Sequence, residues 1–215
     1  MINLAARKRL GWIISQMTND PRTKHAAVMR AEAATKGDPF KILVFTMLSA
    51  RTKDAATLEV VERLFRIADT PEKVASLNQK KLESILYGVG FYHVKAKHLI
   101  AMCRSLQDVP DTLEGLLALP GVGRKTANIV LARAFGKDTI GVDVHVNRIS
   151  NRLGIVSTKK PEETEKELLR FVPKGMRRSL NRSFVAFGQT VCLPRNPKCP
   201  ECPLNKICYK VGVAR

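Results

Sequence analysis

Apolar residues recur at helical spacing along most of this chain. They fall at positions i, i+3, i+4 and i+7 in three segments, residues 61–68, 82–89 and 127–134. Thr70 followed by Pro71 is a typical helix start, because the hydroxyl can cap the first turn and proline suits its first position. Alternating strand patterns bounded by hairpin turns do not occur. The sequence therefore predicts an all-α protein of about ten short helices.

Basic residues strongly outnumber acidic ones. The chain has 37 Lys and Arg residues against 19 Asp and Glu, which gives a formal net charge of +18. A charge of this size indicates a polyanionic partner, and nucleic acid is the first candidate. An anionic membrane is the alternative, but the longest apolar stretches, near residues 42–45, are far shorter than the roughly 18 residues of a membrane span. We therefore expect nucleic-acid binding and no membrane-spanning helix.

The length of the chain leaves its division into domains open. A chain of 215 residues with 45% hydrophobic residues can form one large domain or two small interleaved ones. The character of the sequence changes at residues 136–141, after the last helical segment of the middle block. We place a domain boundary there.

Four of the five cysteines crowd near the end of the chain. Cys192, Cys199, Cys202 and Cys208 have the spacing C-x6-C-x2-C-x5-C, among four prolines. A loop so rich in proline has no core of its own to bury them, which indicates a bound metal. Structural zinc sites usually have two close cysteine pairs, whereas this run has one close pair and better suits an iron–sulfur cube. Zinc remains the alternative at this point, and the isolated Cys103 is expected to be a buried core residue.

A glycine-containing turn opens directly into one of the helical segments. It comprises Gly121, Val122 and Gly123 and is followed by Arg124 and Lys125. Glycines allow close approach of the backbone to another molecule, and the amides at a helix N-terminus bind anions. The simpler interpretation is a plain turn between helices. The two cations at its mouth and the overall charge favour a site for a DNA phosphate.

Three motifs carry a resemblance to a known family. They are Leu-Pro-Gly-Val-Gly-Arg-Lys-Thr-Ala-Asn at 119–128, Gly-Val-Asp-Val-His-Val-Asn-Arg at 141–148, and the cysteine tail. In this order they resemble endonuclease III, a family of helix-hairpin-helix DNA glycosylases with abasic-site lyase activity. The resemblance covers about residues 38–209. It implies a six-helix barrel domain at 27–138, an iron–sulfur domain formed by 1–26 and 139–215, and a 4Fe-4S cluster on the four cysteines.

The resemblance also implies a catalytic pair. Lys125 matches the lysine nucleophile of the family, and Asp143 matches its catalytic carboxylate. A glycosylase that also cuts the strand needs an amine to attack the sugar C1′ and hold it as a Schiff base, and a carboxylate can take a proton and stabilise positive charge on the sugar. Outside this family, Lys125 would be interpreted as a phosphate contact and Asp143 as a helix cap.

Two further residues match positions that act in the gap left by a flipped base. Arg51 stands where the family usually has glutamine, and Phe91 stands where it has an apolar wedge. A planar guanidinium or an aromatic ring can occupy a vacated base stack. The alternatives are an exposed charge at a helix end for Arg51 and a core aromatic for Phe91. The departure at Arg51 leaves the substrate range open.

These features together predict a bifunctional base-excision enzyme. We expect a monomeric DNA glycosylase and abasic-site lyase that removes oxidised or damaged pyrimidines from double-stranded DNA. The alternatives are a glycosylase for thymine or uracil opposite guanine and a non-catalytic helix-hairpin-helix DNA-binding module. The expected location is cytoplasmic or nucleoid-associated, or nuclear or mitochondrial in a eukaryote.

Overall fold

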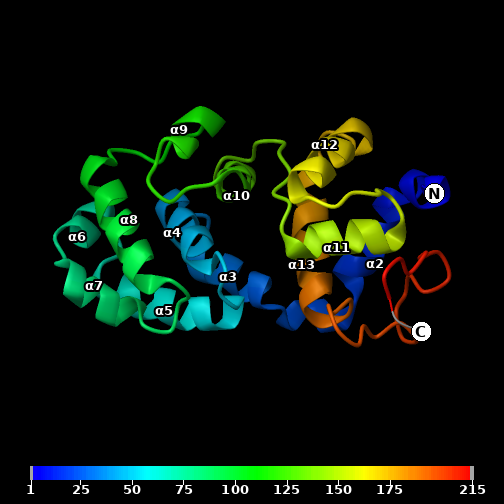
Figure 1. Ribbon diagram of the computed structural model, residues 1–215, viewed down its shortest axis with the longest axis horizontal. Helices are drawn as coiled ribbons and strands as arrows, with labels where there is room; N and C mark the ends of the chain where they lie inside the picture. The colour runs from blue at the N-terminus through cyan, green and yellow to red at the C-terminus, as the bar shows by residue number, and fades with distance from the viewer. Residues whose placement is uncertain (1, 214–215) are drawn as a thin grey trace. The chain divides into compact units, whose positions relative to one another are not determined.

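The computed structural model describes residues 2–213, and within these residues all regular secondary structure is helical. This confirms the predicted all-α class. The chain divides into two compact units, residues 30–137 and residues 1–29 with 138–215. Helix α3 (Ala27–Thr35) contains the point at which the chain passes from one unit to the other (Figure 1).

The unit at residues 30–137 is built around one apolar helix. Its helices are α4 (Pro39–Ser49), α5 (Asp54–Ile67), α6 (Pro71–Ala75), α7 (Gln79–Leu86), α8 (Tyr92–Ser105), α9 (Leu113–Leu117) and α10 (Arg124–Ala134). Residues 42–48 of α4 are all buried, because α4 packs against α5, α8 and α10. A helix that is apolar on all sides is expected at the centre of a domain. The C-terminus of α4 therefore ends among its neighbours, next to Arg51.

The predicted helix start at Thr70 is confirmed. Thr70 caps α6 by accepting a hydrogen bond from the backbone of Lys73, as its sequence pattern indicates. Thr112 caps α9 in the same way, by accepting from the backbone of Gly115. The carboxylate of the preceding Asp111 forms an ion pair of 2.8 Å with Lys137.

The second unit combines both ends of the chain. Its helices are α1 (Leu4–Lys8), α2 (Leu10–Asn19), the 3₁₀ helix η1 (Pro21–His25), α11 (Val144–Leu153), α12 (Pro161–Phe171) and α13 (Arg177–Thr190). Its core includes Ile13, Met17, Phe184 and Phe187, each at most 1% exposed. Helix α13 packs against α2 and α11, and a loop without helix follows it. In the described part of the chain, no helix is long and apolar enough to cross a membrane.

Candidate active site

The predicted glycine turn joins α9 to α10. Gly121 has φ +79°, and a β-carbon there would lie 2.7 Å from Met47 Cε and 2.8 Å from His98 Nδ1. Only glycine satisfies both the positive φ and this close approach. Val122 is buried in the core of the unit, so its backbone, and not its side chain, is available to a ligand. The turn is thus a hairpin that is anchored to the core of the unit by the buried side chain of Val122.

The hairpin presents an open helix N-terminus. Gly123 caps α10 without any side-chain hydrogen bond, and a β-carbon at Gly123 would meet nothing within 4 Å. The first turn of α10 has no acidic residue and begins with Arg124 and Lys125. Backbone amides, the positive end of the helix dipole and two cations therefore coincide here, an arrangement that favours an anion such as a DNA phosphate.

Lys125 is half-buried in this first turn. Among residues 2–213 its amine has no hydrogen-bond or salt-bridge partner. An amine that is not engaged by a carboxylate or a carbonyl can be directed to a substrate carbon. The structure thus leaves Lys125 chemically available.

Asp143 is the N-cap of α11, in the other unit. Its Oδ1 accepts hydrogen bonds of 2.9 Å from the backbone amides of both His145 and Val146. Oδ2 takes part in neither bond. The helix-cap interpretation is therefore correct, and it is compatible with catalysis, because capping holds the carboxylate in one orientation while one oxygen stays available.

Arg51 and Phe91 line one cavity in the unit at residues 30–137. The cavity has a volume of about 250 Å³, and its wall also includes Met47, His98 and Gly121 of the hairpin. The guanidinium carbon of Arg51 lies 4.9 Å from the centre of the Phe91 ring. Phe91 is 59% exposed, so it is not a core aromatic. The structure brings these two residues and the hairpin glycine together.

Lys95 lies on the wall of the same cavity and was missed by the sequence analysis. It is only 7% exposed, and desolvation by burial lowers its pKa to about 8. A lowered pKa is often a sign of a catalytic lysine. However, its Nζ already donates to the carbonyls of Leu48 and Ala50, at 2.7 and 2.6 Å. One sequence signal was present: Lys95 continues the buried face of Leu99 and Met102, at positions i, i+4 and i+7.

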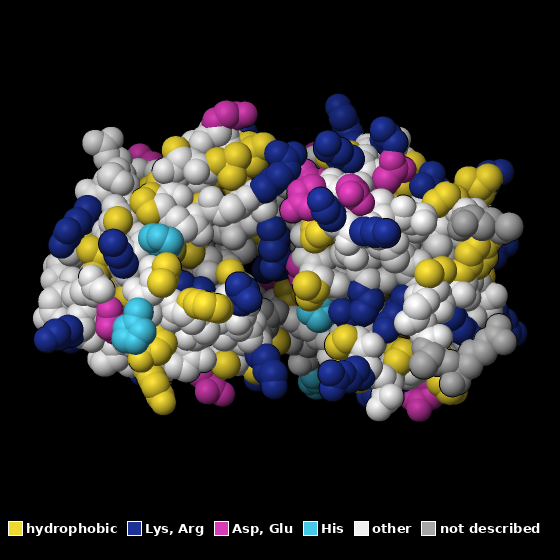
Figure 2. Space-filling model, viewed as in Figure 1, with side chains coloured by type: hydrophobic (Ala, Val, Ile, Leu, Met, Phe, Trp, Pro, Cys, Tyr) yellow, Lys and Arg dark blue, Asp and Glu magenta, His cyan; other side chains and the backbone are white. Residues whose placement is uncertain are grey.

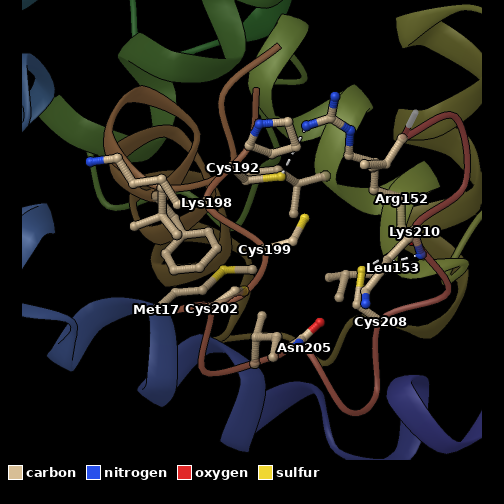
Figure 3. A pocket seen from close by; sticks show the side chains of 16 residues that line it. Met17, Arg152, Leu153, Cys192, Lys198, Cys199, Cys202, Asn205, Cys208 and Lys210 are labelled. Atoms are coloured by element: carbon tan, nitrogen blue, oxygen red, sulfur yellow. Dashed lines mark hydrogen bonds between the residues drawn. The ribbon is translucent and has the colours of Figure 1, made fainter. Parts of the chain in front are cut away.

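The four clustered cysteines surround a second cavity, in the unit formed by the chain ends (Figure 3). Its wall is apolar apart from the thiols, Asn205 and three cations, Arg152, Lys198 and Lys210, and it contains no acidic residue. A cluster bound by four thiolates carries net negative charge, which these cations would offset. The residues present therefore fit an iron–sulfur cluster with one cysteine on each iron.

Two arginines of helix α11 donate hydrogen bonds to the cysteine loop. Arg148 donates to the carbonyl of Cys192 at 2.9 Å, and Arg152 donates to the carbonyl of Leu193 at 2.6 Å. Arg152 also lies 3.3 Å from the sulfur of Cys192 (Figure 3). Helix α11, which Asp143 caps, is therefore bonded directly to the first of the four cysteines. When bound, the cluster would link the four cysteines and so hold this loop, which contains no helix, in one conformation.

The surface charge matches the composition. Figure 2 shows Lys and Arg side chains distributed over one face of each unit, with fewer acidic side chains among them. An excess of basic over acidic side chains on this face is expected of a surface that meets a polyanion.

Two protein-family models match this chain. The model of the HhH-GPD superfamily of base excision DNA repair proteins matches residues 44–174, and the iron–sulfur binding domain of endonuclease III matches residues 192–208. Endonuclease III of Thermotoga maritima is 45% identical over 176 residues, which cover 80% of this chain and 83% of that protein. The chain belongs to the endonuclease III family. It is accordingly a DNA glycosylase and abasic-site lyase, and its four clustered cysteines lie in the iron–sulfur binding domain of the family.

Solved structures of DNA glycosylases superpose well on this chain. A trapped covalent intermediate between endonuclease III and DNA has a TM-score of 0.76 and 33% identity, and covers 86% of this chain and 93% of its own. A thermostable thymine-DNA glycosylase has a TM-score of 0.79 and 25% identity, covering 96% and 97%. The helix-hairpin-helix fold is thereby confirmed, and the match to the iron–sulfur binding domain of endonuclease III confirms the 4Fe-4S prediction.

Proposed function

We propose that Lys125 is the nucleophile and Asp143 the catalytic carboxylate of this enzyme. The hairpin belongs to the predicted barrel domain, residues 27–138, and Asp143 to the predicted iron–sulfur domain, residues 1–26 and 139–215. The observation that carries the proposal is an unpartnered amine in the first turn of the hairpin helix, beside an open phosphate site. A binding module needs the phosphate site but neither the free amine nor the oriented carboxylate.

The chemistry follows from these two groups. The neutral amine of Lys125 forms a bond to the sugar C1′, and the bond between C1′ and the base breaks, with its electron pair and a proton going to the base. Opening of the sugar ring leaves an iminium between Lys125 and C1′. Loss of a proton from C2′ then expels the 3′ phosphate, which cuts the strand. Asp143 takes the amine proton and stabilises positive charge that develops on the sugar.

Arg51 and Phe91 fill the gap left by the flipped nucleotide. Phe91 is an exposed ring on the rim of a cavity and Arg51 stacks against it, so both can enter a vacated base stack. Base flipping requires such a replacement, because an empty gap loses the stacking of two neighbours. Either side chain inserted into the duplex leaves the opposite base unpaired but enclosed.

The substrate class is oxidised or ring-damaged pyrimidines in double-stranded DNA, acted on by a monomer. Membership of the endonuclease III family supports this class, and a solved relative described as an endonuclease III–DNA covalent intermediate supports the Schiff-base route. The similarity to a thymine-DNA glycosylase, together with Arg51 in place of glutamine, favours thymine or uracil opposite guanine as the second candidate.

Borohydride trapping of the Lys125→Gln variant tests the nucleophile. The wild-type protein should form a covalent adduct with abasic or damaged duplex, whereas Lys125→Gln should form no adduct and cut no strand. Affinity for damaged DNA should largely survive, because one cation among 37 basic residues is a small part of the electrostatic attraction. A normal yield of adduct with Lys125→Gln would assign the reaction to another amine.

A panel of duplexes tests the substrate class. It contains thymine glycol, dihydrouracil, uracil or thymine opposite guanine, and an abasic site, and each is assayed with wild-type protein and Arg51→Gln. Faster excision of thymine glycol and dihydrouracil supports the oxidised-pyrimidine class. Faster excision of the guanine mismatches would replace it with the second candidate. Arg51→Gln should change the ranking of lesions, whereas equal losses on every duplex would assign Arg51 to the DNA backbone.

A further inference from the structure

Two residues on the cavity wall have an unusual backbone conformation. Arg51 has φ +56° and Phe91 has φ +59°, although neither is glycine. Residues other than glycine rarely adopt this left-handed region, and they keep it only where their surroundings enforce it. Both are the residues for which insertion into DNA is proposed above. The contacts that enforce the two conformations are therefore of functional interest.

The buried amine of Lys95 joins the segments that carry these residues. Its Nζ donates to the carbonyls of Leu48 and Ala50, in the last turn of α4 and just after it, and to Thr52 Oγ1 at 3.2 Å. The carbonyls at a helix C-terminus lack partners within the helix, and an ammonium group satisfies them well. Lys95 thus binds the backbone carbonyl of Ala50 before Arg51 and the side-chain hydroxyl of Thr52 after it.

The same amine reaches the Phe91 segment through Thr52. The Thr52 hydroxyl oxygen also accepts a hydrogen bond of 3.0 Å from the backbone amide of Gly90. A β-carbon at Gly90 would lie 2.8 Å from the carbonyl oxygen of Arg51, so the two segments touch at the backbone. Lys95 itself lies in the first turn of α8, where its own amide donates to the carbonyl of Phe91.

We propose that Lys95 is a positioning residue that locks the Arg51 and Phe91 segments into one rigid unit, so that both side chains enter the duplex together when a damaged base is flipped. This inference rests on the insertion roles proposed above. Lys95 does not touch the reacting sugar, since its three hydrogen-bond directions are taken by protein oxygens. Its burial lowers its pKa to about 8, and at neutral pH it remains mostly an ammonium group with three donors.

Lys95→Met tests the inference, because methionine keeps the length and packing of the side chain but donates no hydrogen bond. Single-turnover base excision from damaged duplex should slow by about tenfold to a hundredfold, the usual effect of misplacing groups by an ångström. Strand cleavage at a preformed abasic site in single-stranded DNA should stay at the wild-type rate, because no base stack has to be filled. Lys97→Met, an exposed lysine on the same helix, is the matched control and should leave both rates unchanged.

A second pair of variants separates positioning from general loss of structure. Thr52→Val removes only the link to Gly90 and should reproduce part of the Lys95→Met effect. In an Arg51→Ala, Phe91→Ala background, Lys95→Met should slow base excision by less than about twofold, because the residues through which it acts are gone. Fluorescence of 2-aminopurine opposite the lesion should report lost insertion in Lys95→Met and in the Arg51→Ala, Phe91→Ala protein alike.

Three results would overturn the inference: wild-type excision by Lys95→Met, equal slowing on single-stranded abasic DNA, or an undiminished effect of Lys95→Met in the Arg51→Ala, Phe91→Ala background. If the Arg51→Ala, Phe91→Ala protein itself excises bases at the wild-type rate, the proposed insertion roles are wrong and the inference fails with them. Slow excision by that protein with normal excision by Lys95→Met would overturn the inference alone.

Discussion

At the scale of single residues, substitution can separate the observed role of Asp143 as a helix cap from the catalytic role proposed for it. Asparagine caps a helix as well as aspartate does but carries no charge, whereas alanine neither caps the helix nor carries a charge. We expect Asp143→Asn to melt within a degree or two of the wild-type protein, and Asp143→Ala to be less stable by about 1 kcal/mol. Both should lose base excision sharply, and both should retain more cleavage at a preformed abasic site, where no glycosidic bond has to break.

Thermal melting and a two-substrate assay check this prediction. Asp143→Asn is the informative variant, since its α11 N-terminus remains capped through the amides of His145 and Val146. Normal base excision by Asp143→Asn would show that Asp143 is only a cap.

At the scale of secondary-structure elements, the two glycines of the hairpin between α9 and α10 are expected to differ in role. Gly121 is required for folding, and Gly123 is proposed to contact DNA. Gly121→Ala forces a left-handed alanine, at a cost of about 1–2 kcal/mol, and drives its methyl group into Met47 and His98. Gly123→Ala meets no atom within 4 Å and has an ordinary φ of −99°. We expect Gly121→Ala to be clearly destabilised and Gly123→Ala to lose less than about 1 kcal/mol.

Gly123→Ala, the more stable of the two variants, should nevertheless lose affinity for DNA. The Gly123→Ala methyl group stands at the open N-terminus of α10, where a phosphate would approach, so this stable variant should bind abasic-analogue duplex more weakly. Melting temperature and fluorescence anisotropy are measured on the same preparations. Wild-type affinity for Gly123→Ala would exclude close backbone contact between this glycine and DNA.

At the scale of the whole molecule, the net charge of +18 should dominate binding to undamaged DNA. Each phosphate that is neutralised contributes about 0.9 to the slope of log affinity against log salt concentration. We expect a slope of several units, and a decrease of no more than about 1 in Lys125→Gln. Anisotropy titrations between low and moderate salt measure both slopes. A nearly flat dependence would mean that the basic surface meets a different partner.

The sequence alone was sufficient wherever function depends on residue type and short spacing. The all-α class followed from apolar periodicity, because burial of one face requires that spacing. The hairpin turn, the iron–sulfur domain and the family membership followed from motifs whose residues are close in sequence. The roles of Lys125 and Asp143 stay predictions from the same motifs. Helix starts such as Thr70 were predictable for the same reason, since a cap and its amide lie three residues apart.

Only the tertiary structure revealed how distant segments are held together. Lys95 is 45 residues from Ala50 and 43 from Thr52, so no local pattern shows that its amine joins them. The left-handed conformations of Arg51 and Phe91 also have no signal in their side-chain types, and the two segments that carry them meet where Gly90 approaches the carbonyl of Arg51. Likewise, the hydrogen bond from Arg148 to the carbonyl of Cys192 depends on how α11 packs beside the cysteine loop. Motifs and helix caps depend on residues that are close in sequence and can be read from it. Long-range hydrogen bonds form only after folding has brought remote parts of the chain within hydrogen-bonding distance.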